Sequence, residues 1–249
     1  MRPTRIRDLK MKRVFSKLVG IILIAVCASC DKDCYDTIKG NGNLLTSEKS
    51  VSTFEKIATH GFAEVLYYAS EEHRVVVTVD SNLEQFVEIY TKNNVLNIGV
   101  RKNVSCSFTK YLVEVYAPVL TGVSLDGFGA FEGMDMIAVS KFESTISGSG
   151  FIKGAFECEN FSAKISGFGE LTITGNSKNT HIDISGSGKF NGKEFETKNA
   201  TVNISGFGNV YMWVNDHLKA TISGSGNLYY SGEPKVDSSV SGSGRIKKM

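Results

Sequence analysis

The sequence predicts an all-β protein, in which a parallel β-helix, or solenoid, of coils of about 18–21 residues follows an irregular β-rich part. Three observations predict this class. A Gly-x-Gly unit recurs at near-constant spacing, apolar residues recur at even distances from each unit, and no long segment has the 3.6-residue periodicity of a helix.

The recurrence of Gly-x-Gly is the strongest of these observations. The first glycines of the seven units are separated by 21, 19, 19, 20, 18 and 18 residues. A repeat of this length is typical of a solenoid, in which each repeat forms one coil stacked on the next. The glycines, which we expect to be structural, are Gly127, Gly129, Gly148, Gly150, Gly167, Gly169, Gly186, Gly188, Gly206, Gly208, Gly224, Gly226, Gly242 and Gly244.

The apolar residues around each unit alternate as they do in strands. Two residues before the first glycine, every repeat has a branched aliphatic residue, from Leu125 to Val240. Four residues after that glycine, every repeat has an apolar residue, from Phe131 to Ile246. Even spacing directs these side chains to one side of a strand, so each coil should have an apolar inside and a polar outside.

The glycines themselves lie between two inward positions. We expect them to supply a bend that other residues resist, or room where a neighbouring wall approaches closely. The residue between the glycines is, in order, Phe128, Ser149, Phe168, Ser187, Phe207, Ser225 and Ser243. If this column faces out, it forms an apolar seam. If the glycines reverse the alternation, it packs inside, and the alternating sizes favour packing.

Residues 41–120 are β-rich but less regular, and residues 121–249 form the repeated coils. The stretch "THGFAEVLYY" resembles a degenerate first coil, and "SNLEQFVEIYTKNN" fits a short helix or a turn followed by a strand. Asn93 and Asn94 predict a hairpin turn between "FVEIYT" and "VLNIGV". No linker rich in Pro, Gly or Ser separates the two parts, so we expect one continuous body.

Residues 1–29 predict a lipoprotein signal peptide. Seven basic residues precede or flank the apolar run "LVGIILIAVCA", which ends in "CASC". Cys30 would then be the lipidated first residue of the mature chain, and residues 30–40 would form a tether. The alternatives are an ordinary secretory signal or a short membrane anchor. Asp31 is compatible with retention in the inner membrane, whereas the acidic "DKD" favours the outer membrane or cell surface.

Charge and cysteine usage follow from this processing. The full chain has 28 basic and 26 acidic residues, and residues 1–29 hold seven bases and one acid, which leaves 21 bases and 25 acids, or −4. The basic pI therefore gives no indication of nucleic-acid binding. Cys34, Cys106 and Cys158 remain, at no metal-ligand spacing. A Cys34–Cys106 disulfide and three idle thiols are both compatible with the sequence.

Several segments together resemble a known family. "FEKIATHGFAEVLYY", "VLNIGV", "YLVEVYAPVL" and the repeated "SGSG" units are similar to the head-GIN domain family of proposed auto-transporter adhesins. The resemblance covers roughly residues 40–248. It implies a secreted, lipid-anchored, all-β protein of right-handed β-helical type, and it implies no established activity.

The sequence shows no catalytic motif, metal site or cofactor motif. The best candidate binding residues are Tyr211, Trp213 and Tyr229, because exposed aromatic side chains on a rigid sheet can stack on sugars or anchor a protein partner. We therefore expect a non-enzymatic envelope lipoprotein that acts as an adhesin or binds glycan or protein. The alternatives are a structural envelope protein without a specific ligand and, less favoured, a polysaccharide-active enzyme.

Overall fold

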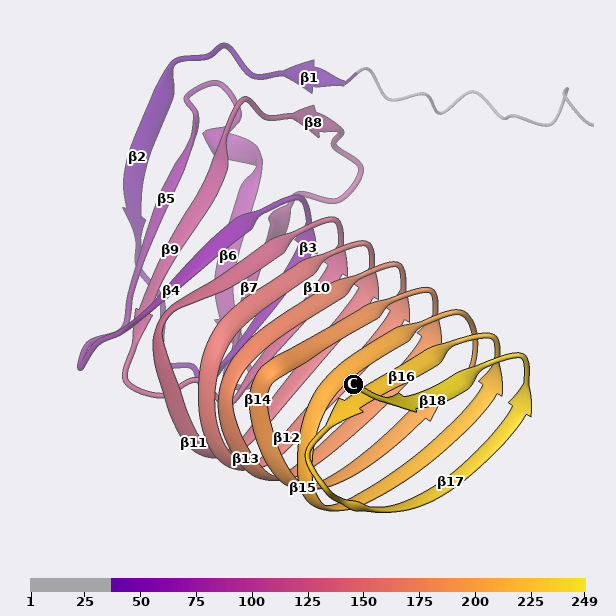
Figure 1. Ribbon diagram of the computed structural model, residues 1–249. Helices are drawn as coiled ribbons and strands as arrows, with labels where there is room; N and C mark the ends of the chain where they lie inside the picture. The colour runs from indigo at the N-terminus through magenta and orange to yellow at the C-terminus, as the bar shows by residue number, and fades with distance from the viewer. Residues whose placement is uncertain (1–36) are drawn as a thin grey trace, which may run out of the picture. The chain divides into compact units, whose positions relative to one another are not determined.

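Parallel strands stack coil upon coil through most of the chain in the computed structural model, which describes residues 37–249 (Figure 1). Each long strand bends, so that its first part belongs to one coil and its last part to the next. Each long strand also pairs in parallel with the long strands before and after it in the chain. The all-β solenoid predicted from the repeat is confirmed. Its strands are β10 (Gly122–Gly127), β11 (Ala130–Gly148), β12 (Phe151–Gly167), β13 (Glu170–Gly186), β14 (Lys189–Ile204), β15 (Asn209–Gly224), β16 (Asn227–Ser231), β17 (Lys235–Gly242) and β18 (Arg245–Lys248).

The first glycine of every Gly-x-Gly unit turns the chain at one edge of the coils. All seven have a positive φ, between 109° and 156°, which residues with a Cβ rarely adopt. There is also no room for a side chain at this position, because a Cβ on Gly186 would lie 2.6 Å from the carbonyl oxygen of Gly167 in the preceding coil. The second glycine is buried in all units but the last, and a Cβ on Gly188 would overlap the side chain of Ile165. Both expected roles of glycine are therefore present, divided between the two positions.

The residue between the glycines faces solvent. Phe128, Phe168 and Phe207 are 65%, 75% and 68% exposed, and the serines of the same column are exposed too. The expectation that this column packs inside is wrong. The ordinary alternation of the strand continues through both glycines, so the residue between two inward-facing positions points outward.

Phenylalanine side chains fill the inside of the coils. Phe142, Phe156, Phe161 and Phe195 are at most 1% exposed, and their ring centroids lie 4.5 to 5.9 Å apart where they are in contact. Above and below them, the predicted inward positions are buried from Leu125 to Ile222. The buried side chains form one continuous core, in which ring contacts join β11 to β12 and β12 to β14.

The solenoid begins earlier in the chain than the regular repeat. β3 (Lys56–Gly61) pairs in parallel with β10, and β4 (Glu64–Ala69) pairs in parallel with β11, which confirms "THGFAEVLYY" as a first coil. A further coil lies beyond it. β7 (Val95–Val100) pairs in parallel with β3, and β9 (Tyr111–Ala117) pairs in parallel with β4.

Antiparallel strands close this N-terminal end. β6 (Val87–Lys92) forms a hairpin with β7 through Asn93 and Asn94, both of which have positive φ, so the predicted turn is confirmed. β5 (Arg74–Asp80) pairs with β9, β2 (Leu44–Lys49) pairs with β5, and β1 (Ile38–Lys39) pairs with β8 (Cys106–Ser107). We call the strands β2, β5 and β6 the N-terminal cap, because they cover the edge that the first coils would otherwise expose.

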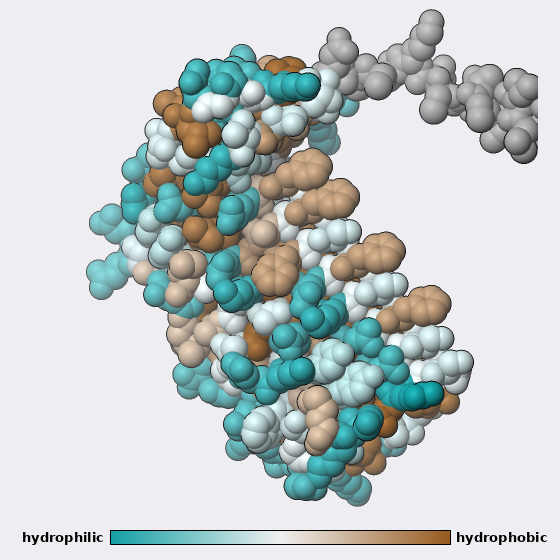
Figure 2. Space-filling model, turned by 45° about the horizontal axis from the view of Figure 1, so that its top comes forward, coloured by the Kyte–Doolittle hydropathy of each residue, from teal (hydrophilic) through white to brown (hydrophobic). Residues whose placement is uncertain are grey.

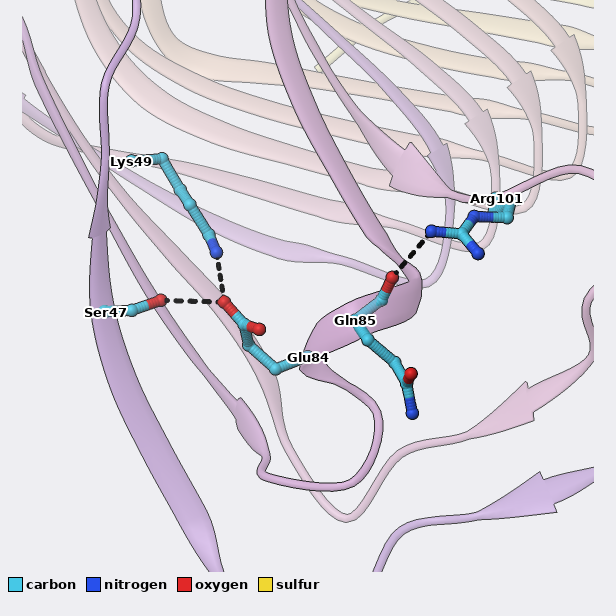
Figure 3. A network of polar contacts seen from close by, with 5 residues as sticks. All are labelled: Ser47, Lys49, Glu84, Gln85 and Arg101. Carbon is cyan, nitrogen blue, oxygen red and sulfur yellow. Dashed lines mark hydrogen bonds and ion pairs between the residues drawn. The ribbon is translucent and has the colours of Figure 1, made fainter.

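A short 3-10 helix, η1 (Glu84–Phe86), joins β5 to β6 and ties the cap together (Figure 3). Glu84 accepts a hydrogen bond from Ser47 at 3.4 Å and forms an ion pair with Lys49, both on β2. The Lys49 ammonium lowers the pKa of the Glu84 carboxyl. Arg101, just after β7, donates to the Gln85 carbonyl oxygen at 3.0 Å. These contacts fix β2 and the end of β7 to one turn.

The C-terminal end has no comparable cap among the described residues. β17 pairs with β15 and is exposed along its whole length, and its inward residues Val236 and Val240 are 38% and 43% exposed. The inward side chains of the last coil are therefore exposed to solvent. No helix within residues 37–249 is long and apolar enough to cross a membrane.

Candidate binding surfaces

The three predicted binding residues lie together on the outer wall of the last coils. Tyr211 of β15 and Tyr229 of β16 occupy paired positions, and their rings stack with centroids 4.9 Å apart and planes 9° from parallel. Trp213 lies two residues beyond Tyr211 on the same strand and is 39% exposed. We call these three residues the wall cluster. The two tyrosine rings stack on each other across adjacent strands, and Trp213 lies further along β15.

A lysine that the repeat does not predict completes the wall cluster. The Lys193 ammonium lies 4.8 Å from the centroid of the Tyr211 ring, within the range of a cation–π interaction. Lys193 lies in a bulge of β14, where the register shifts between Gly192 and Glu196. A residue in a bulge has no fixed place in a periodic pattern, so aligning the repeats could not reveal this contact.

A second aromatic surface runs along the edge where the Gly-x-Gly turns lie (Figure 2). Phe62 belongs to it, since Gly61 pairs with Gly127 and the rings of Phe62 and Phe128 stack 5.5 Å apart. We call Phe62, Phe128, Phe168 and Phe207 the aromatic edge. Phe62 was not predicted to belong to this column. Aligning "HGFAE" with the repeats would have shown it, because Gly61 occupies the first glycine position.

Polar side chains pair from coil to coil over much of the remaining wall. Lys153 forms an ion pair with Glu132, and Lys189 forms one with Glu170 at 2.8 Å. The side-chain amides of Asn160, Asn179 and Asn199 are joined by hydrogen bonds of 3.0 Å from one coil to the next. Paired charges and amides of this kind are already satisfied within the protein. Trp213 and the four phenylalanines of the aromatic edge, in contrast, are exposed to solvent, from 39% for Trp213 to 75% for Phe168.

Catalytic chemistry has little support from the described residues. Within residues 37–249, no group of three or more His, Cys, Asp or Glu side chains could hold a metal ion. Burial raises the pKa of the Cys158 thiol to about 11 and also raises the pKa of Cys106, so neither is an activated nucleophile. Cys30 and Cys34 lie outside the described residues, and both the lipidation and the Cys34–Cys106 pairing stay predictions.

The parallel pairing of successive coils defines the fold as a parallel β-solenoid. The chain belongs to the family described as "Putative auto-transporter adhesin, head GIN domain", which matches residues 53–234. This range is more than half of the chain and confirms the family that the repeats resemble. No curated protein sequence matches the chain.

Several crystal structures share the fold. A "putative lipid binding protein" from Parabacteroides distasonis is 25% identical over 86% of this chain and 99% of its own, with a TM-score of 0.73. A "putative adhesin" from the same species is 26% identical over 86% and 100%, with a TM-score of 0.70. A "putative adhesin" from Bacteroides fragilis, with 20% identity over 85% and 100% and a TM-score of 0.80, shows likeness of fold alone.

Proposed function

We propose that this protein is a non-enzymatic, lipid-anchored adhesin of the cell envelope that binds saccharide through the wall cluster. Membership of an adhesin family supports an adhesin-like role at the cell surface or envelope. The names of the similar structures point to adhesion or lipid binding. The coils are filled by phenylalanine rings, which favours contact on the outer wall over a ligand enclosed inside.

The stacked pair of Tyr211 and Tyr229 beside Trp213 is the observation that carries this proposal. Sugar rings have apolar faces that pack on aromatic rings, and the partly exposed Trp213 would supply such a ring. The hydroxyls of the two stacked tyrosines and the Lys193 ammonium would supply hydrogen bonds to sugar oxygens. The Trp213 indole N–H donates to Asn215 at 2.9 Å, which fixes the orientation of the ring. A surface held in place in this way needs little ordering when a ligand binds.

Anchoring follows from the predicted signal. Lipidation at Cys30 would attach the mature chain to a membrane, and the acidic residues after it favour the outer membrane or the cell surface. A structural envelope protein without a ligand is the competing function. It requires no saccharide binding, so one binding experiment distinguishes the two.

Trp213 is the only tryptophan of the chain and reports on the wall cluster directly. We expect glycans selected on an array to change the Trp213 fluorescence in a saturable way. Tyr229→Ala should weaken that binding by about tenfold, because loss of one stacked aromatic typically costs 1–2 kcal/mol. Tyr90→Ala, which removes an exposed tyrosine of the cap, is the matched control. Absence of any glycan response in the wild type would favour the structural role.

A further inference from the structure

The Gly-x-Gly edge carries one outward side chain on each of eight successive coils. The register of the coils brings Gly61 and the seven repeat glycines into one column, so the residues that follow them are also aligned. All four phenylalanines of the aromatic edge are at least 65% exposed. A line of exposed rings of this kind marks a contact with a partner. In chain order the column is Phe62, Phe128, Ser149, Phe168, Ser187, Phe207, Ser225 and Ser243.

This order is complementary to its own reverse. When the column is read from the opposite end, every phenylalanine meets a serine and every serine meets a phenylalanine. Phe62 meets Ser243, Phe128 meets Ser225, Ser149 meets Phe207, and Phe168 meets Ser187. We propose that the aromatic edge binds the same edge of a second copy of this chain. The two solenoids would run antiparallel about a two-fold axis between the coils of Phe168 and Ser187.

In this arrangement the rings of the two copies interleave. Each level of the stack holds one ring, supplied by one copy where the other has serine. Adjacent levels are about 4.8 Å apart, which is within the usual range for interacting aromatic rings. The pair of Phe62 and Phe128 shows the same packing within one chain, with centroids 5.5 Å apart. Serine leaves the room that each incoming ring needs.

The charges beside the aromatic edge fit the same symmetry. A two-fold axis across the edge places each column of one copy against the same column of the other. The column after the second glycine would therefore bring Glu64 to Arg245 and Glu170 to Lys189 of the partner copy. Glu170 and Lys189 also pair within one chain at 2.8 Å, so four charges would alternate around the axis.

The opposite flank brings no like charges together. The column before the first glycine has serine in its last six coils, from Ser147 to Ser241, and His60 and Asp126 in its first two. Antiparallel docking would place His60 against Ser241 and Asp126 against Ser223. Four rings per copy, each 65–75% exposed, can bury roughly 400–700 Å² per partner, and the flanking columns add to this toward the roughly 800 Å² of a standard interface.

A bilayer is the competing occupant of an exposed aromatic line, and it makes the opposite prediction for added rings. Membrane binding increases with every aromatic residue placed on the edge. Self-association depends instead on the space that the serines leave between the rings, so an additional ring at Ser187 would collide with Phe168 of the second copy. The inference uses a surface other than the wall cluster and does not depend on saccharide binding.

Sedimentation velocity tests the proposal by measuring dimerisation of variants in which a ring is removed, added or exchanged with a serine. Residues 37–249 form one compact unit with its own core, so the chain from residue 31 can be compared without lipid. We expect the wild type to dimerise. Phe168→Ser and Ser187→Phe should each weaken the dimer by about tenfold or more, because they remove or obstruct a central aromatic contact. The double variant Phe168→Ser/Ser187→Phe exchanges ring and gap and should restore it.

A charge swap provides an independent arm. Glu64 and Arg245 are seven coils apart, about 34 Å at the usual strand spacing, so they cannot meet within one chain. Glu64→Arg and Arg245→Glu should each weaken the dimer several-fold, and the double variant should restore it. A wild type that stays monomeric up to about 100 μM, well above a micromolar dissociation constant, would overturn the proposal. So would tighter binding of Ser187→Phe to phosphatidylcholine vesicles without any loss of self-association.

Discussion

At the scale of single residues, the Gly-x-Gly units show how one repeat meets two different steric demands. The first glycine supplies the positive φ of the corner, and the second leaves room for an isoleucine of the preceding coil. Gly186 lies in the middle of the stack, so neighbouring coils hold it on both sides and limit relaxation. Its substitution is therefore the clearest test of the corner geometry.

We expect Gly186→Ala to lower the free energy of unfolding by roughly 1–3 kcal/mol, since alanine would be held at a φ of 147° with its Cβ against the Gly167 carbonyl oxygen. Ser187→Ala, on the exposed neighbour, should change it by less than about 0.5 kcal/mol. Denaturant unfolding of both variants measures the difference. Equal losses would show that the corner does not require glycine.

The inward residues of the coils could be predicted from the sequence, because burial repeats with the coil and leaves aliphatic and aromatic residues at fixed offsets. The orientation of Phe128, Phe168 and Phe207 could not. Alternating large and small residues are compatible with a packed interior and with an outer surface, and only the path of the chain through the glycines decides between them. Lys193 was missed because a bulge has no place in a period.

At the scale of elements, a buried carboxylate joins the loop before β2 to the loop before β9. Asp80, at the end of β5, is fully buried and accepts hydrogen bonds from the backbone N–H of Gly42 at 2.8 Å and of Thr109 at 2.7 Å. Burial by itself would raise the pKa of Asp80, but these hydrogen bonds outweigh it and hold the pKa below its ordinary value. The carboxylate therefore stabilises the folded cap in its ionised form.

The sign of the pH dependence follows from that lowered pKa. Asp80 should contribute its full stabilisation above the unfolded pKa of about 3.9, and lose it as the pH falls through the lower folded value. We expect Asp80→Asn to reduce the melting temperature by several degrees near neutral pH, and by progressively less in acid. Asp237→Asn, on the exposed strand β17, is the control. A difference between Asp80→Asn and wild type that does not shrink in acid would contradict this account.

The arrangement of the cap was harder to predict than its strands. Apolar and polar residues alternate as in strands in "RVVVTVD", "VLNIGV" and "YLVEVYAP", and Asn93–Asn94 predicts one hairpin. The sequence order does not show that β7 and β9 build a coil on the far side of β3 and β4, because the chain returns past the first coil to reach β10. Pairing of this kind depends on contacts between distant segments, which a local pattern does not encode.

At the scale of the whole molecule, the solenoid is a rigid support with two aromatic surfaces at different places. The wall cluster faces outward from the last coils, and the aromatic edge runs along the glycine corners. The N-terminal cap covers one end of the stack, while β17 leaves the other end open. Binding through a side wall would leave the coil-to-coil packing unchanged, which suits the proposed role in adhesion.

The most direct test of the central claim is attachment of cells that display the full chain. We expect Tyr211→Ala/Trp213→Ala/Tyr229→Ala to abolish attachment to a glycan-coated surface while its melting temperature stays within a few degrees of wild type, as surface substitutions usually do. Cys30→Ala should lose attachment by release from the envelope. Attachment equal to wild type in the folded triple variant, at equal surface level, would contradict the account.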